Sequence, residues 1–404
     1  MTERIETIVV GAGQAGLAAS YFLTQEGREH IVFERGRVGE TWRSQRWDGF
    51  YLNTPNFAQR LPGFHYTGDE PEAFAPLHEV VAYLEGYASS FEAPLRETVD
   101  VVHIARHDDE FVLDTSAGAF QSRNVVIAAG AYQRPTPTSA SESVPGDVFQ
   151  LHTTEYRRPD QLPDGAILIA GSGQSGCQIA DELLDAGRRV YLSCGHCGWF
   201  PRRYRSRELV HWLIETGLVD DTPADLPSPA ARLRCNPPVS GNGGGHDCHP
   251  RWLADRGAIL LGRVLGFDGS AARIGDNLDE ALAWGDAFAA EFRQKVDEYV
   301  AERHLDIPVE DVISPGSVQS VSDLDLRRDG VSTILWANGF RPDHSWIDGV
   351  ETDEQGWPFH VGGASPVPGL YFVGIHWLRT RKSSLFLGVG EDAERVVSQL
   401  VASR

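Results

Sequence analysis

The sequence predicts an α/β fold in which one strand–turn–helix–strand unit occurs twice. Near the N-terminus a short apolar run breaks into Gly11-Ala12-Gly13-Gln14-Ala15-Gly16, and a later run breaks into Gly171-Ser172-Gly173-Gln174-Ser175-Gly176. The distance between the two runs is too long for a solenoid repeat, so it indicates a duplicated domain. A chain of 404 residues is long enough for two or three domains, each with its own core.

Hydrophobic periodicity predicts the elements around each glycine run. Residues 7–10 and 30–34 are short apolar runs typical of strands, and residues 17–23 have the spacing of a helix. In the second unit we expect strand 166–170, helix 177–186 and strand 189–193. Two further strands, at 124–128 and 332–336, end in glycine turns. Two longer helices are expected at 279–300 and 391–401.

Composition narrows the class of partner. The chain has 36 Lys and Arg against 57 Asp and Glu, a formal net charge of −21. Such a chain repels nucleic acid and anionic membranes, so we expect neither as a partner. It has no signal-peptide pattern, no apolar stretch of the roughly 18 residues that a membrane span needs, and too few cysteines for a disulfide framework. We expect a cytoplasmic protein with a small-molecule substrate, and a homodimer stays open.

The first glycine run has the features of a dinucleotide site. Gly11 permits a tight turn, Gly13 lets the backbone approach a pyrophosphate, and Gly16 lets helix and strand pack closely. The helix N-terminus, at Gln14 and Ala15, offers N–H groups and partial positive charge to phosphates. Glu34 ends the second strand, where an acid accepts hydrogen bonds from a ribose diol, and Arg35 follows it.

The second glycine run lacks that acid. Gly171, Gly173 and Gly176, with Gln174 and Ser175, repeat the turn and helix start; these residues are expected to bind the second dinucleotide. The following strand ends at Ser193, and Arg202 and Arg203 lie just beyond it. Arginines there favour a 2′-phosphate, hence NADPH over NADH. The alternative is that these arginines form a solvated face or pair with acids elsewhere.

Two dinucleotide sites in one chain indicate hydride transfer from a nicotinamide to a flavin. We therefore expect two Rossmann-like dinucleotide-binding domains, for FAD and NADP, with the second inserted within the first. The expected FAD-binding domain comprises residues 1–155 and 320–404. The expected NADP-binding domain comprises residues 156–319, with a Pro- and Gly-rich excursion at about 223–250 and a linker at 132–165.

At this point the sequence resembles the flavin-containing monooxygenases, particularly the short bacterial members and their plant indole-pyruvate monooxygenase relatives. The segments that carry the resemblance are 11–16, Glu34, Gly39-Glu40-Thr41-Trp42, 171–176 and Ala337-Asn338-Gly339-Phe340-Arg341-Pro342-Asp343. The family pattern F-x-G-x-x-x-H-x-x-x-[FY] is matched only by its end, His152 and Tyr156. Of these two, His152 is expected to be structural.

The resemblance implies an activity and a set of site residues. It implies that NADPH reduces FAD, that O2 then forms a C4a-(hydro)peroxyflavin, and that nitrogen, sulfur or a carbonyl carbon of a small organic substrate is oxygenated. Asn53 is the candidate catalytic residue, although an Asn before Thr54-Pro55 also suits a turn. The remaining expected cofactor-binding residues are Thr41, Trp42, Ala129, Gly130, Asn338, Gly339, Gly374 and Leu387.

The cysteines allow two other hypotheses. Cys194-Gly195-His196-Cys197 is a C-x-x-C pair, which would suit a reductase of a disulfide or an electron carrier. A zinc site would use this pair with Cys235, Cys248, His246 and His249, but the second half lacks ligand spacing. We expect reduced, unligated thiols and no metal. A flavoprotein that binds both cofactors only as a sensor is the third alternative.

Overall fold

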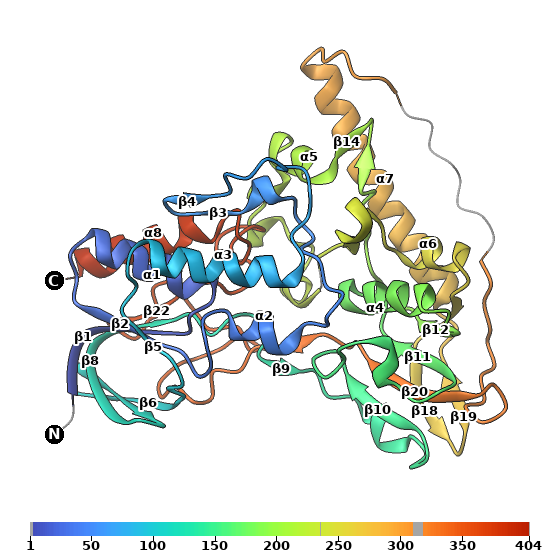
Figure 1. The fold of residues 1–404 in the computed structure, drawn as a ribbon, viewed down its shortest axis with the longest axis horizontal. Helices are drawn as coiled ribbons and strands as arrows, with labels where there is room; N and C mark the ends of the chain where they lie inside the picture. Colours follow the sequence, from blue (N-terminus) through green and yellow to red (C-terminus); the bar gives the residue numbers. More distant parts are fainter. Residues whose placement is uncertain (1–2, 235, 310–317, 404) are drawn as a thin grey trace.

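Each glycine turn follows a central strand of its own sheet. The computed structural model describes residues 3–234, 236–309 and 318–403. In the first sheet, β1 (Glu3–Val10) lies between β2 (His30–Phe33) and β8 (Gly118–Ile127), all parallel. In the second sheet, β11 (Ala166–Ala170) lies between β12 (Val190–Ser193) and β20 (Val331–Trp336), also parallel. The two sheets occupy opposite halves of the molecule (Figure 1).

The first sheet is completed by residues from both ends of the chain. Strand β8 pairs with β1 along one edge; along the other it pairs first with β7 (Glu110–Thr115) and then with β22 (Leu370–Phe372). The outer strands are β5 (Leu95–Arg96) and β6 (Val101–His107). Because β22 follows the whole second sheet in the chain, the first domain is discontinuous, and the predicted insertion of one domain in the other is confirmed.

The second sheet takes in more of the chain than the predicted segment 156–319. Its order is β10-β20-β11-β12-β17, with β10 at Phe149–His152 and β17 at Ile259–Leu261. Strand β10 lies in the predicted linker, and β20 lies in the stretch assigned to the first domain. A strand's own residues do not indicate which sheet it joins, since apolar runs suit either sheet. The strand positions themselves agree with the pattern.

Helices cover both sheets where periodicity predicts them. In the first domain they are α1 (Gln14–Gln25), α2 (Glu40–Gln45), α3 (Leu77–Ser90) and α8 (Val389–Ala402). In the second they are α4 (Gln174–Asp185), α5 (Leu209–Glu215), α6 (Pro250–Asp255) and α7 (Leu278–Glu302). The remaining strands form two-stranded pairs: β3 (Arg60–Leu61) with β4 (Phe64–His65), β9 (Arg134–Pro135) with β21 (Phe340–Arg341), β13 (Arg203–Tyr204) with β14 (Arg207–Glu208), β15 (Val239–Ser240) with β16 (His246–Asp247), and β18 (Val264–Asp268) with β19 (Ala271–Ile274).

The same steric contact occurs in both glycine turns. A Cβ on Gly16 would overlap the carbonyl oxygen of Gly11, and a Cβ on Gly176 would overlap that of Gly171. Gly11 and Gly171 have φ of 107° and 123°, a region that side chains other than glycine's rarely adopt. The absence of side chains therefore lets each helix start directly against the end of its strand.

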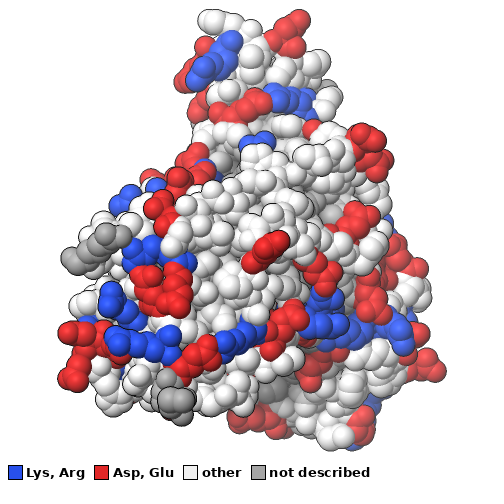
Figure 2. All heavy atoms as spheres, turned by 60° about the vertical axis from the view of Figure 1, so that its left-hand side comes forward, with Lys and Arg blue, Asp and Glu red and all other residues white. Residues whose placement is uncertain are grey.

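Acidic and basic side chains are mixed on the surface. Figure 2 shows acidic and basic side chains interspersed on one face, so the excess of acids does not form a single-sign area there. Among the described residues, no helix is long and apolar enough to cross a membrane.

The steric contact can be tested in the second unit. Gly176→Ala is expected to destabilise the protein by about 1–3 kcal/mol, because the added methyl group overpacks a backbone contact. Gly146→Ala is the matched control, since a Cβ there meets no atom within 4 Å and its φ is not in the left-handed region. Thermal unfolding midpoints measure both. Equal midpoints for the two variants would show that the close contact at Gly176 does not affect the stability of the protein.

Candidate active site

One cavity of about 600 Å³ is lined by both glycine turns. It opens between the two sheets, so groups predicted from distant segments meet in one place. The predicted residues that line it are Gly11, Gly13, Gln14, Ala15, Glu34, Arg35, Thr41, Trp42, Asn53, Ala129, Gly130, Gly173, Gln174, Ser175, Gly339 and Gly374. Gly16, Gly171 and Gly176 lie behind it, at the helix–strand contacts, and Asn338 and Leu387 are not part of its wall.

The first turn fits a dinucleotide diphosphate and ribose. Gly13 caps α1 without any side-chain hydrogen bond, and a Cβ on Gly13 would meet nothing within 4 Å, so the helix N-terminus faces open space. Glu34 is buried. One of its carboxylate oxygens accepts from the Ala12 N–H at 2.8 Å and the other from the Gly36 N–H at 2.9 Å. Each oxygen keeps a lone pair for a ribose hydroxyl.

The second turn repeats this arrangement. Gly173 caps α4 with φ −75° and ψ −173°, close to the −85° and −173° of Gly13, and again no side chain caps the helix. Ala337, after β20, lies against Gly171, just as Ala128, after β8, lies against Gly11; Cβ atoms on these glycines would be 2.5 and 2.6 Å from the alanine carbonyl oxygens. The two turns are therefore equivalent in structure, and both fit a diphosphate.

The polar residues predicted to hold a 2′-phosphate are engaged elsewhere. Arg202 is buried, pairs with Glu208 and donates to the Asn53 carbonyl oxygen at 2.7 Å. Arg203 donates to the carbonyl oxygens of Gly244 and Gly245. Buried Ser193 donates to the Gly262 carbonyl and accepts from the Val264 N–H, so it fixes a turn. None of the three lines the cavity.

Another arginine lies at the end of the neighbouring strand. Arg263 follows β17 and is exposed. Its Nη2 lies 3.4 Å from where a Cβ on Gly195 would be, and its backbone N–H donates to the Asn277 side-chain oxygen. Among the described residues no acid pairs with its guanidinium. Because Gly195 follows β12, Arg263 lies at the edge of the sheet where a cation for the 2′-phosphate is expected. Sequence reasoning missed it because β17 is distant in the chain from the glycine turn.

Asn53 lies at the junction of the two domains. Its side-chain oxygen accepts from Gln178 of α4 at 2.6 Å, and Gln178 also donates to the Val239 carbonyl at 3.0 Å. Within the described part of the chain the Asn53 amide nitrogen has no hydrogen-bond partner. Gln178 thus orients the Asn53 amide so that its N–H groups remain for a ligand in the cavity.

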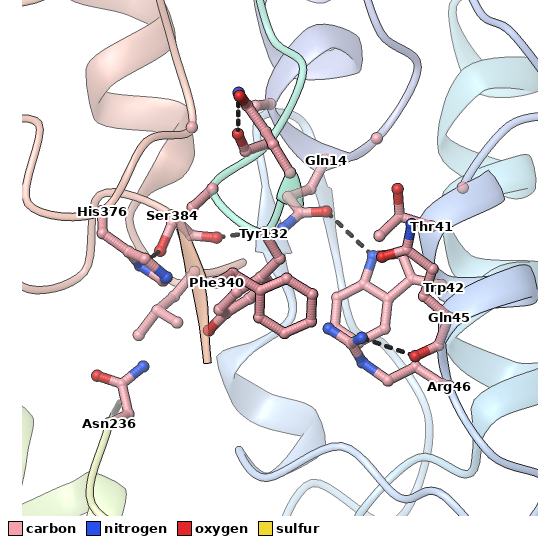
Figure 3. Close-up of a pocket in the computed structure, with 18 of the residues that line it drawn as sticks. Gln14, Thr41, Trp42, Gln45, Arg46, Tyr132, Asn236, Phe340, His376 and Ser384 are labelled. Carbon is pink, nitrogen blue, oxygen red and sulfur yellow. Dashed lines mark hydrogen bonds between the residues drawn. The ribbon is translucent and has the colours of Figure 1, made fainter. Parts of the chain in front are cut away.

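A chain of hydrogen bonds links the first turn to the C-terminal return. The Trp42 indole N–H donates to the Gln14 oxygen at 3.1 Å, and Gln14 donates to the Ser384 carbonyl at 3.1 Å (Figure 3). Ser384 hydroxyl in turn lies 2.9 Å from His376 Nδ1. Burial and nearby Arg232 lower the pKa of His376 to about 4, so this ring is neutral at physiological pH.

The second domain closes the cavity with residues that sequence reasoning missed. The described parts of segment 209–239, residues 209–234 and 236–239, contribute Leu209, Val210, Leu213, Val219, Asn236, Pro237 and Val239 to the wall. The segment is held to the C-terminal return by the ion pairs Arg381–Asp221, at 2.6 Å, and Lys382–Asp220, at 2.8 Å. The short apolar run of α5 was the one feature of the sequence that could have indicated this wall, and such a run also suits an ordinary core helix.

The cysteine pair lies outside this cavity. Cys194 and Cys197 are buried, reduced thiols, and burial raises the pKa of Cys194 to about 12. Such a thiol is not a nucleophile near neutral pH. The pair lines a separate small hollow beside Trp199 and His249.

The candidate zinc ligand His246 and His152 each have protein partners of their own. The described residues include no cluster of three His, Cys, Asp or Glu that could hold a metal, while Cys235 lies outside them. His246 pairs with Asp181 instead. His152 Nδ1 lies 3.1 Å from the Thr154 hydroxyl, and the Tyr156 hydroxyl donates to Glu182 at 2.7 Å.

Comparison with known proteins agrees with a protein that binds two dinucleotides. The pyridine nucleotide-disulphide oxidoreductase family matches residues 8–218. An uncharacterized CzcO-like oxidoreductase of Geobacillus kaustophilus is 30% identical over 404 residues, 99% of each chain. The indole-3-pyruvate monooxygenase YUCCA4 of rice is 26% identical over 203 residues, 46% of each chain.

Solved structures share the fold over the whole chain. A flavin monooxygenase from Stenotrophomonas maltophilia has a TM-score of 0.65 at 19% identity and 99% coverage of both chains. A bacillithiol disulfide reductase from Staphylococcus aureus has the same TM-score at 12% identity and 100% coverage of both chains. The chain belongs to the pyridine nucleotide-disulphide oxidoreductase family and is similar to flavin-containing monooxygenases, and it is a flavin-dependent oxidoreductase.

The buried thiols lead to a direct prediction. The double variant Cys194→Ser/Cys197→Ser is expected to keep NADPH-dependent turnover within about 2-fold of the parent, because a protonated buried thiol takes no part in electron transfer. NADPH consumption in air measures this, with flavin content as the control for folding. Loss of turnover in a variant that keeps its flavin would instead favour the reductase hypothesis.

Proposed function

We propose that the protein is an NADPH-dependent FAD monooxygenase of a small organic substrate. The observation that carries the proposal is the shared cavity: both glycine turns and Asn53 line it, and the cysteine pair does not. A disulfide reductase needs its thiols beside the flavin, whereas an oxygenase needs only a closed space beside it. The geometry therefore favours oxygenation over disulfide reduction.

The residues divide between the two cofactors. Gly11, Gly13 and Glu34 hold FAD, with the α1 N-terminus at its diphosphate. Gly171, Gly173 and the α4 N-terminus hold NADPH in the same way. A bound FAD would supply the chemistry that carries a hydride equivalent from NADPH to O2, with one oxygen atom entering the substrate and the other leaving as water. A sensor that only binds both cofactors is the competing function.

The protein's own contribution is orientation and exclusion of water. Asn53 is placed to donate a hydrogen bond to an oxygen atom in the cavity, and Gln178 fixes the direction of that bond. Trp42 and Phe386 stack with ring centroids 5.8 Å apart, and Phe340 and Tyr132 lie across from Trp42 (Figure 3). These rings form an apolar wall that limits the access of water to the reacting atoms.

The oxygenation step is tested with isotopically labelled O2. The purified protein, NADPH and a panel of amines, sulfides, ketones and 2-keto acids are combined, and products are analysed by mass spectrometry. We expect one labelled oxygen atom in at least one product class. Complete recovery of the consumed O2 as peroxide with every class would contradict the proposal, and failure of NADPH to reduce the flavin at all would favour the sensor.

Asn53→Ala is expected to lower the yield of oxygenated product per NADPH about 100-fold, as for the loss of one oriented donor to a developing charge. Anaerobic reduction of the flavin by NADPH is expected to change by less than about 3-fold, since Asn53 is not assigned to either diphosphate. Gln178→Ala is the positioning variant and should give a smaller loss of coupling. Unchanged coupling in Asn53→Ala would remove Asn53 from the oxygenation step.

Arg263 is proposed to bind the 2′-phosphate of NADPH in place of Arg202 and Arg203. Arg263→Ala is expected to raise the KM for NADPH about 10- to 100-fold, the loss of a charge-assisted hydrogen bond, and to leave the KM for NADH unchanged. Arg303→Ala, in the same domain, is the matched control. A change in NADPH preference on Arg203→Ala and none on Arg263→Ala would restore the assignment expected from the sequence.

A further inference from the structure

An arginine that pairs with no acid among the described residues lines the shared cavity. Arg46 follows the last residue of α2, and one N–H of its guanidinium donates to the Gln45 carbonyl at 3.0 Å. The guanidinium carbon lies 5.3 Å from the ring centre of Trp42, 5.8 Å from that of Phe50 and 5.7 Å from that of Tyr132. Figure 3 shows Arg46 beside Trp42, on the side of the cavity opposite His376.

The other arginines of the cavity wall differ from Arg46. Arg134 pairs with Asp343, Arg381 pairs with Asp221, and exposed Arg35 adjoins Glu34 at the expected adenosine end. Within the described ranges, no carboxylate lies within ion-pair distance of Arg46. Burial lowers the pKa of Arg46, yet a guanidinium stays charged at physiological pH. Arg46 is half-buried, and a partly desolvated charge is stabilised by a counter-charge, which an anionic group bound in this cavity would supply.

The backbone at Arg46 is held in place from the other domain. Arg157, which follows Tyr156, donates to the Arg46 carbonyl at 3.1 Å and also to the Ser44 carbonyl. Three aromatic rings surround the guanidinium and restrict its rotamers. The Arg46 side chain is therefore preorganised, as expected for a group that fixes the orientation of a ligand.

The diphosphates of the two dinucleotides do not require this cation. Their diphosphates are served by the N-termini of α1 and α4, which face the cavity at Gly13 and Gly173 without side-chain caps. Arg46 is thus left for a third molecule. The planar guanidinium matches a carboxylate with two parallel hydrogen bonds, and the nearby aromatic rings suit an apolar body attached to it.

We propose that Arg46 binds the carboxylate of the substrate, so that the enzyme oxygenates organic acids in preference to their neutral analogues. This inference rests on the proposed function for the reaction, but it concerns binding alone. Arg46 acts as a specificity-determining residue: it holds the acid end of the molecule and thereby directs the rest of the molecule toward the apolar part of the cavity.

Binding is measured by calorimetry on the flavin-loaded, oxidised protein, without turnover. The probes are 3-(methylthio)propanoate and phenylpyruvate, each compared with its primary amide. We expect each acid to bind the parent at least 10-fold more tightly than its amide. In Arg46→Met this preference should disappear, in Arg46→Lys it should be partly kept, and in Arg134→Met, the control with a paired arginine, it should be unchanged.

Several outcomes overturn the proposal. One is the failure of both acids to bind the parent at millimolar concentration, and another is an unchanged preference for acids in flavin-loaded Arg46→Met and Arg46→Lys. A third is weaker binding of NADP⁺ in Arg46→Met with acid binding unchanged, which would assign Arg46 to the dinucleotide diphosphate. Arg46-dependent acid binding without incorporation of labelled oxygen would leave this proposal standing and contradict only the monooxygenase function.

Discussion

The architecture depends on two places where a helix backbone lies directly against the turn that precedes it. Gly16 against Gly11 and Gly176 against Gly171 allow this approach, because any side chain would overlap a carbonyl oxygen. Since each helix begins at the end of a central strand, its unpaired N–H groups point into the space beyond the sheet. Insertion of one domain in the other then brings the two helix N-termini to one cavity.

Polar contacts across the domain boundary fix what the glycine turns bring together. Gln178 of the second domain orients Asn53 of the first, and Arg202 reaches from the second domain to the Asn53 carbonyl. Arg157 holds the backbone at Arg46 in a similar way. The same buried groups that join the domains thus set the direction of the side chains facing the cavity. Arg202, which follows the second glycine motif in the sequence, therefore joins the two domains and does not line the cavity.

Local pattern predicted much of the fold, because the two strand–glycine turn–helix units depend on residues close in sequence. The positions of β11, α7 and α8 follow from periodicity for the same reason. The membership of β10 and β20 in the second sheet does not, since parallel pairing depends on contacts far apart in the chain. Likewise Glu34 lies directly after β2 beside the first turn because its position depends on residues close in sequence, whereas Ser193 and Arg202 are bound by partners that only the folded chain supplies.

The central claim is that a nicotinamide and a flavin meet within this one cavity. Its most direct test is anaerobic stopped-flow mixing of the flavin-loaded protein with NADPH carrying deuterium at the transferred position. We expect bleaching of the flavin absorbance at a rate that saturates with NADPH and shows a primary isotope effect of about 2 or more, because hydride passes directly between two oriented rings. A flavin that stays oxidised, or a rate without saturation, would contradict it.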